Sequence, residues 1–123
     1  MTKFAIAAVC TALTLSSAVA ADFGPSDLGR IVDMARNQEA KFQRDVKGKT
    51  FAGTAKVRSI SQNWLTSNYQ VNTRIANQEV TCWVKKSNSS KLADIDNGDS
   101  VTINGIVRDT VLGDLQVDDC RVN

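Results

Sequence analysis

The stretch KGKTFAGTAKVRSI, residues 47–60, marks the point where the chain changes from a helical to a strand pattern. Beyond its first residues the apolar side chains recur at every second position, which predicts a half-buried β-strand. Phe51, Gly53, Ala55 and Val57 form one face of this strand, and the glycine indicates a bulge or a sharp coil. The rest of the chain repeats the pattern between short turns, as successive antiparallel strands do.

Four further strands are predicted. Ala76 and Asn77 make the tight turn of a hairpin between the second and third strands, and a polar connection over residues 87–97 favours a short helical turn at one end of the sheet. In the last strand a bulge at Asp118 and Asp119 restores the alternation of inward side chains. These strands are expected over residues 69–75, 79–85, 101–107 and 115–122.

An amphipathic helix is predicted ahead of the strands. Ser26 follows the Gly24-Pro25 break and is a suitable N-cap, and Gly48 can take the left-handed conformation that ends a helix. Apolar side chains recur at helical spacing between these two positions. We therefore expect one continuous helix over residues 26–47.

The first twenty residues have the pattern of a signal peptide. Lys3 is the only charge before Asp22, and an apolar run over residues 4–15 is followed by Ala18-Val19-Ala20. The run is shorter than the roughly 20 residues that cross a bilayer, so a retained anchor is the weaker alternative and no stable membrane insertion is expected. The sequence predicts cleavage after Ala20 and a single periplasmic or secreted domain over residues 21–123.

Two cysteines, Cys82 and Cys120, remain in that domain. In an oxidising compartment paired cysteines are usually bridged, so a disulfide is predicted. Five strands with a helical insert after the third match a five-stranded Greek-key barrel of the OB type, in which the third and fifth strands are neighbours. Both cysteines occupy inward positions on those strands. The fold class is therefore mainly β, an OB-fold barrel preceded by one amphipathic helix.

The chain resembles the tRNA_anti-like OB-fold domains of bacterial secreted and lipoprotein chains. The resemblance covers most of residues 21–123 and rests on the leading helix and on four segments. It implies the OB fold and the cell envelope as the place of work, and it carries over no functional residues. The segments are KGKTFAGTAKVRSI (47–60), VTCWVK (80–85), NGDSVTINGIVRD (97–109) and LQVDDCRVN (115–123).

Several function classes lose support from composition. The formal net charge of +2 is too small to indicate a nucleic-acid-binding surface. The sequence contains no histidine, which is the commonest general base and metal ligand. Glu39 and Glu79 are the only glutamates and neither has a motif around it. No nucleophile motif of the G-x-S-x-G or S-x-x-K kind occurs. We expect a protein that is not an enzyme and that carries no cofactor.

A group of acidic residues before the fourth strand has some likeness to a calcium loop. Asp94, Asp96 and Asp99 surround Gly98, and closely spaced oxygen ligands on a bent turn can hold a hard cation. The full pattern fails, because Gly98 comes one residue early and Gly105 stands where the bidentate glutamate should be. We interpret the segment as a polar turn and expect no metal site.

The best candidate site combines aromatic and basic side chains on the outside of the barrel. OB-folds bind ligands across their second and third strands and the adjoining loops, where aromatic rings stack and cations hold phosphates. One alternative stays open for Trp83: the N-terminal helix must bury its apolar side, and it could do so against the Trp83 ring, which would then not be free to bind a ligand. The predicted ligand-binding residues are Arg58, Trp64, Arg74, Trp83 and Lys85.

The sequence thus favours a small exported OB-fold module, monomeric and non-enzymatic, that recognises a protein or another cell-envelope ligand. The alternative is single-stranded nucleic-acid or oligosaccharide binding through the same face, which rests on analogy of fold.

Overall fold

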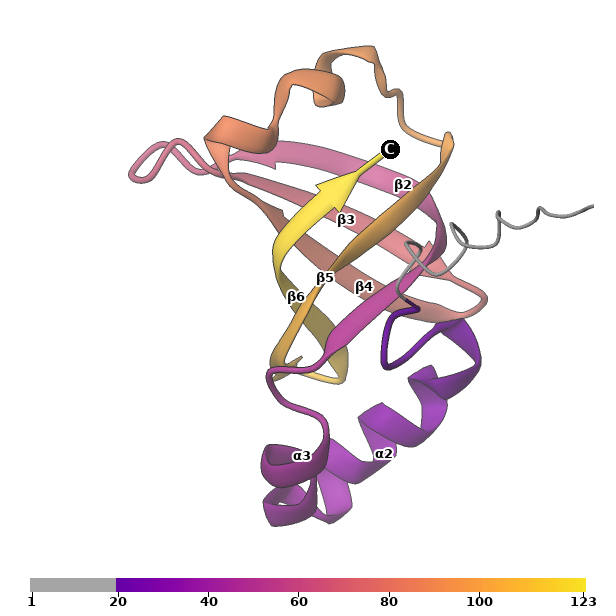
Figure 1. Cartoon of the computed structure of the whole chain (residues 1–123). Helices are drawn as coiled ribbons and strands as arrows, with labels where there is room; N and C mark the ends of the chain where they lie inside the picture. The colour runs from indigo at the N-terminus through magenta and orange to yellow at the C-terminus, as the bar shows by residue number, and fades with distance from the viewer. Residues whose placement is uncertain (1–19) are drawn as a thin grey trace, which may run out of the picture.

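Five strands close into a barrel in the order β2-β3-β4-β6-β5 (Figure 1). The computed structural model of the chain describes residues 20–123. All neighbouring strands are antiparallel except β4 and β6, which run parallel where Val80 pairs with Leu115. This is the mainly β, OB-type barrel predicted from the sequence. The strands are β2 (Thr50–Gln62), β3 (Tyr69–Ile75), β4 (Gln78–Val84), β5 (Ser100–Val111) and β6 (Asp114–Val122).

The core fills the barrel because inward side chains alternate with outward ones along each strand. In β5, Val101, Ile103, Gly105 and Val107 are buried while the residues between them are exposed. β5 continues to Val111, so it is longer than the strand expected over residues 101–107 and includes part of the connection to the last strand. The β5–β6 hairpin is closed by a tight turn at Leu112 and Gly113, both with positive φ.

The predicted bulge in β6 is confirmed. Asp119 has a φ of +48°, and the pairing with β5 shifts between Asn104 and Ile106. The extra residue returns Cys120 to the barrel interior, where it forms the predicted disulfide with Cys82 across a Cα–Cα distance of 5.5 Å. Both cysteines are fully buried. The bridge therefore joins β4 to β6 inside the core.

The N-terminal helix is divided in two, which corrects the expectation of one continuous helix over residues 26–47. A 3-10 turn, η1 (Pro25–Asp27), leads into α2 (Leu28–Asn37), and α3 (Glu39–Asp45) follows. Gln38 leaves the helical region with φ −141° and ψ 58°. Phe42 of α3, beyond the break, is buried and belongs to the core cluster. Figure 1 shows both helices below one end of the barrel.

Gly53 does not form the expected bulge. The register of β2 shifts at Arg58, between Val57 and Ser59, whereas Gly53 lies in regular pairing with Ile103. A Cβ atom on Gly53 would lie 2.6 Å from Cγ of Pro25. The glycine thus makes room for the N-terminal segment against β2.

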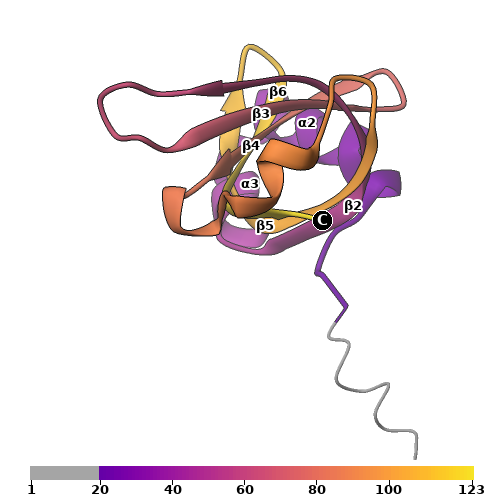
Figure 2. The same cartoon turned by 90° about the horizontal axis from the view of Figure 1, so that it is seen from above.

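Two short 3-10 helices, η2 (Lys86–Asn88) and η3 (Ser90–Asp94), close the other end of the barrel. Leu92 of η3 is buried and belongs to the core cluster, as the polar connection with few apolar residues had indicated. Figure 2 looks down on this segment, with the β2–β3 hairpin projecting to one side.

The signal peptide predicted over residues 1–20 lies outside the described residues except for Ala20, so it stays a prediction. Within residues 20–123, no helix is long and apolar enough to pass through a bilayer.

Candidate ligand-binding site

Residues 20–24, directly before η1, run along the first residues of β2, and we call this segment the strap. Phe23 pairs with Phe51 in a parallel bridge, with its N–H donating to the Thr50 carbonyl at 3.0 Å. The Asp22 carboxylate accepts the Thr50 N–H at 3.0 Å, and this hydrogen bond holds the pKa of Asp22 below its usual range. The strap places Ala21 beside the outer face of the barrel.

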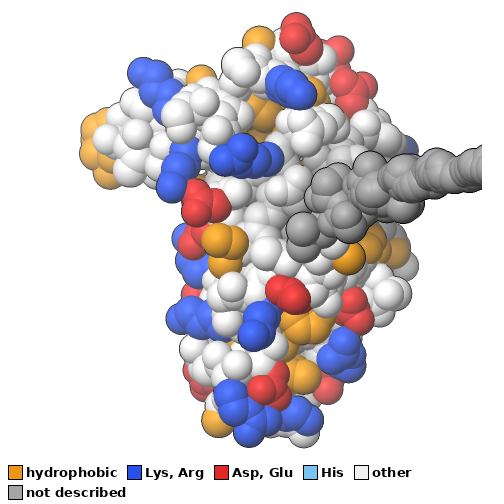
Figure 3. All heavy atoms as spheres, in the orientation of Figure 1, with side chains coloured by type: hydrophobic (Ala, Val, Ile, Leu, Met, Phe, Trp, Pro, Cys, Tyr) orange, Lys and Arg blue, Asp and Glu red, His pale blue; other side chains and the backbone are white. Residues whose placement is uncertain are grey.

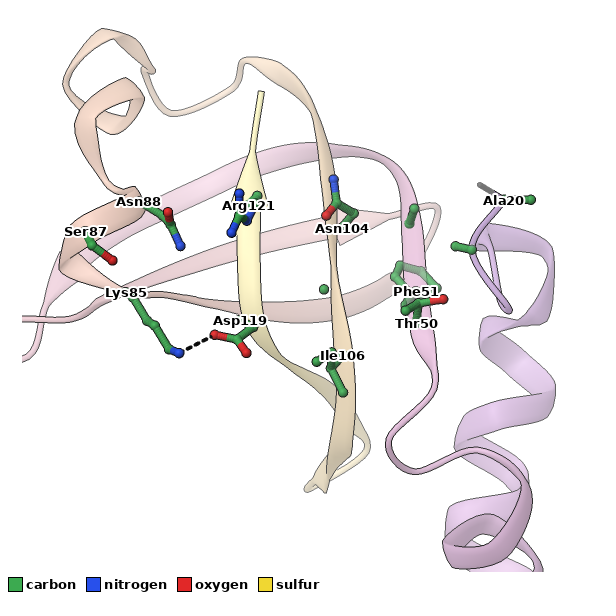
Figure 4. A pocket seen from close by; sticks show the side chains of 13 residues that line it. Ala20, Thr50, Phe51, Lys85, Ser87, Asn88, Asn104, Ile106, Asp119 and Arg121 are labelled. Carbon is green, nitrogen blue, oxygen red and sulfur yellow. Dashed lines mark ion pairs between the residues drawn. The ribbon is translucent and has the colours of Figure 1, made fainter. Parts of the chain in front are cut away.

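A groove of about 760 Å³ crosses the outer face of β6, β5 and the first residues of β2 (Figure 4). Ala20 and Ala21 of the strap bound it at one end, and the segment from Lys85 to Asn88 bounds it at the other. This size lies within the range of roughly 300–1,000 Å³ that is typical of ligand pockets. The polar side chains that line it are Thr50, Lys85, Ser87, Asn88, Asn104, Asp119 and Arg121.

Strand register brings the central groove side chains together. Asn104 of β5 lies opposite Arg121 of β6, and both point outward and are exposed. The Lys85 ammonium and the Asp119 carboxylate form an ion pair of 2.7 Å at one side (Figure 4). Within residues 20–123, the side chains of Asn104 and Arg121 make no hydrogen bond or ion pair, and both line the groove. Their hydrogen-bonding groups therefore face the groove.

The bulge in β6 shapes this surface. Gly105 allows β5 to approach it, because a Cβ atom there would lie 2.6 Å from the Asp118 carbonyl oxygen and 3.0 Å from the Cα of Cys120. The bulge also sets Asp119 outward, where it meets Lys85. The site thus depends on a backbone detail as well as on side chains.

The sequence-predicted site residues separate into different places. Arg58 and Arg74 both bind Glu79, at 2.9 Å and 2.6 Å. Burial alone would raise the pKa of Glu79, but the two arginine hydrogen bonds hold that pKa below its usual range. Trp83 stands four residues further along β4, roughly 13 Å away at strand spacing. The predicted single patch is therefore divided.

Trp83 is half-buried and lies at the end of β4 that leads into η2. The N-terminal helices lie below the barrel, at the end away from η2 and η3 (Figure 1). Its indole N–H donates to Gln116 Oε1 at 2.8 Å, and the Arg108 guanidinium lies 5.4 Å from the ring centroid. Arg108 in turn binds Asp118 at 3.1 Å. The N-terminal helices therefore do not cover Trp83, and the Arg108 guanidinium lies over its ring instead.

We call the outward side of β3 and β4, together with Arg58 of β2, the paired face. Here Asn72 donates to Ser59 at 2.8 Å and Gln70 donates to Asn72 at 3.0 Å. The hollows on this face are smaller than the groove, about 480 Å³ beside Arg58 and about 280 Å³ beside Trp83. Of the predicted residues, Lys85 alone lines the groove, and Trp64 stands apart on the β2–β3 hairpin.

The sequence did not identify Ser87, Asn88, Asn104 and Arg121 as site residues. Asn104 and Arg121 occupy outward positions of the fourth and fifth strands, which is the only signal that could have drawn attention to them. The acidic turn is held by its own contacts, since Asp99 accepts the Asp96 N–H at 2.9 Å. Within residues 20–123, no three Cys, Asp or Glu side chains gather in a way that could hold a metal ion.

Comparison with solved structures supports the fold. The chain is similar to the crystal structure of a lipoprotein from Klebsiella pneumoniae subsp. pneumoniae MGH 78578 that is described as a candidate nucleic acid-binding protein. The two share 16% sequence identity at a TM-score of 0.64, over 94% of this chain and 99% of the other. No protein-family model matches the sequence, and no curated protein is similar to it. The likeness establishes a shared barrel.

Proposed function

We propose that the protein is an exported, non-catalytic binding module that holds an extended segment of another polypeptide in the groove. The observation that carries this proposal is the pair Asn104 and Arg121, whose exposed polar groups face the groove side by side. The disulfide and the signal-peptide pattern support export.

The chemistry of the groove suits a peptide backbone. A peptide offers alternating N–H donors and carbonyl acceptors, and the amides of Asn88 and Asn104 and the Ser87 hydroxyl can each donate and accept. Arg121 adds a donor for a carbonyl or a carboxylate. Ile106 is 38% exposed and supplies an apolar surface for a ligand side chain.

A polyanion fits the groove less well. Lys85 is already neutralised by Asp119, which leaves Arg121 as the one lining cation without an ion pair within residues 20–123. No tryptophan or tyrosine lines the groove, and Phe51 is fully buried beneath it. Stacking platforms and a basic track are the features that hold single-stranded nucleic acid.

Single-stranded nucleic acid is the second candidate, and a different surface favours it. Trp83, Arg108 and Lys85 border one of the smaller hollows. The description of the Klebsiella lipoprotein points the same way. On this surface, however, phosphates would have to displace Asp118 and Asp119 from their cations.

A display library of unstructured peptides, selected on the immobilised protein, tests the first candidate against the second. We expect peptides that bind with little dependence on salt, and whose addition shifts the amide signals of Ile106 and Arg121. Oligo-dT is titrated in parallel at two salt concentrations, because phosphate contacts weaken steeply as salt rises. Steep salt-dependent binding of oligo-dT, with no peptide selected, would reverse the order of the two candidates.

A further inference from the structure

The tip of the β2–β3 hairpin carries two large apolar side chains that are exposed to solvent. Trp64 is 85% exposed and Leu65 is 72% exposed. The hairpin projects sideways from the barrel in both views (Figures 1 and 2), and hydrophobic side chains form its outermost point in Figure 3. We propose that this tip is a lipid-binding element that inserts shallowly into an anionic membrane surface.

The tip is held in shape by its own hydrogen bonds. The Asn63 side-chain oxygen accepts the N–H of Leu65 at 2.8 Å, and the Asn63 carbonyl accepts the Ser67 N–H at 2.8 Å. The Gln62 amide donates to the Ser67 carbonyl at 3.1 Å. Because these polar groups are already satisfied, moving the tip into a less polar medium leaves fewer of them without a partner.

The charge distribution favours a lipid surface. Residues 59–73 contain no charged side chain, so insertion of the hairpin tip removes no ion from water. Lys86 stands at the base of the hairpin, where its N–H donates to the Asn68 side chain at 3.2 Å. Lys86 is exposed and makes no ion pair within residues 20–123. It is placed to meet an anionic headgroup while Trp64 occupies the interfacial zone.

A folded protein partner fits the tip less well than a membrane does. A stable protein interface covers about 800 Å² on each partner around a desolvated centre. On this hairpin, Trp64 and Leu65 are the only large apolar side chains that are exposed among the described residues. Two residues on a convex point suffice for shallow insertion into a soft surface, which needs no complementary pocket.

The second exposed apolar tip, on the β5–β6 hairpin, provides an internal control. Leu112 is 98% exposed there, but Asp109, which pairs with Arg108 at 3.7 Å, and Asp114 flank it. Anionic headgroups would repel the Asp114 carboxylate, which makes no ion pair within residues 20–123. The proposal therefore assigns membrane contact to the Trp64 tip and none to the Leu112 tip.

Vesicle binding tests the proposal with protein purified from cells that express the full chain. In a Trp83→Phe variant, Trp64 is the only tryptophan of the sequence. Its emission should move to shorter wavelength with vesicles of phosphatidylethanolamine and phosphatidylglycerol. Lys86→Gln should lower partitioning into those vesicles about fivefold. Equal partitioning of the parent protein into phosphatidylcholine vesicles would overturn the part assigned to Lys86.

Co-sedimentation provides a second readout that does not depend on the Trp83 variant. The chain with both Trp83 and Trp64 should sediment with anionic vesicles, a Trp64→Ser/Leu65→Ser variant should not, and Leu112→Ser should behave like the parent. Retention of the Trp64→Ser/Leu65→Ser variant, or an unchanged Trp64 emission, would overturn the proposal. The groove plays no part in this experiment, so its outcome is independent of the proposed function.

Discussion

The paired face and the groove lie on the same barrel and use similar polar residues, yet they differ in what those residues already bind. On the paired face Arg58 and Arg74 share Glu79, and Trp83 is satisfied by Gln116 and Arg108. In the groove the Asn104 and Arg121 side chains have no such partner within residues 20–123.

The comparison teaches that residue type alone does not identify a binding surface. Tryptophan and arginine attract attention in a sequence because they are common at interfaces. Where they bind each other and neighbouring carboxylates, a ligand must first replace those contacts. Asparagine, serine and a single free arginine around a concave surface offer hydrogen bonds at a lower cost.

The largest expected effect comes from the disulfide, which connects β4 of the paired face to β6 of the groove. A Cys82→Ala/Cys120→Ala variant should lose about 4 kcal/mol of unfolding free energy, because the bridge closes a separation of 38 residues in the unfolded chain. Urea unfolding followed by circular dichroism measures it. A loss below about 1 kcal/mol would show that the two faces are held together without the bridge.

Gly105→Ala should affect the groove and leave the paired face intact. The added Cβ would lie 2.6 Å from the Asp118 carbonyl oxygen, so the bulge in β6 must shift. We expect a loss of about 1–3 kcal/mol, the usual cost of overpacking. Amide spectra should change around Asp119 and remain unchanged around Arg74. Gly29→Ala is the matched control, because its Cβ meets no atom within 4 Å.

Glu79→Gln removes the centre of the paired face. Because the carboxylate and both arginines are partly exposed, the expected loss is below about 1 kcal/mol. Arg58 and Arg74 are then left without their carboxylate, while peptide binding in the groove should be unchanged. Calorimetric unfolding and a peptide titration of the same sample check the two statements. Weaker peptide binding would mean that the two faces are coupled.

The smallest effect is expected at acidic pH, at the strap that bounds the groove. The pKa of Asp22 is lowered in the folded protein, so its contribution is present above the unfolded pKa and is lost as the pH falls through the folded value. The protection factor of the Thr50 amide, which is its exchange rate relative to that of an unfolded chain at the same pH, should fall as the pH drops through the lowered pKa of Asp22. Asp22→Asn should remove this pH dependence, and an unchanged profile in that variant would assign the transition to another group.

Much of the fold could be predicted because its signals are local. Alternation fixed the inward side of each strand, and the step from Val117 to Cys120 required the bulge that the structure contains. The break at Gln38 was missed because the helical spacing resumes at Phe42 and Val46, so the polar Glu39 was interpreted as a single interruption within one helix. At Gly53 the expectation was a bulge or a sharp coil, since a sequence does not show that Pro25 packs against the glycine.

The candidate site was less predictable for a physical reason. Whether Arg74 is free or bound depends on Glu79 lying opposite it, which is a property of strand register and not of either residue. The groove likewise requires the register that sets Asn104 beside Arg121. The local sequence pattern predicts the face of the sheet on which a residue lies, but it does not predict which side chain of a neighbouring strand that residue contacts.

The central claim is that the groove, and not the paired face, binds the ligand. Isothermal titration of one selected peptide into three proteins tests it: the parent, Asn104→Ala/Arg121→Ala, and Arg58→Ala/Arg74→Ala. The loss of hydrogen bonds to Asn104 and the charged Arg121 should weaken binding about tenfold or more. The Arg58→Ala/Arg74→Ala protein should bind like the parent. The reverse pattern, with binding lost only from Arg58→Ala/Arg74→Ala, would contradict the claim.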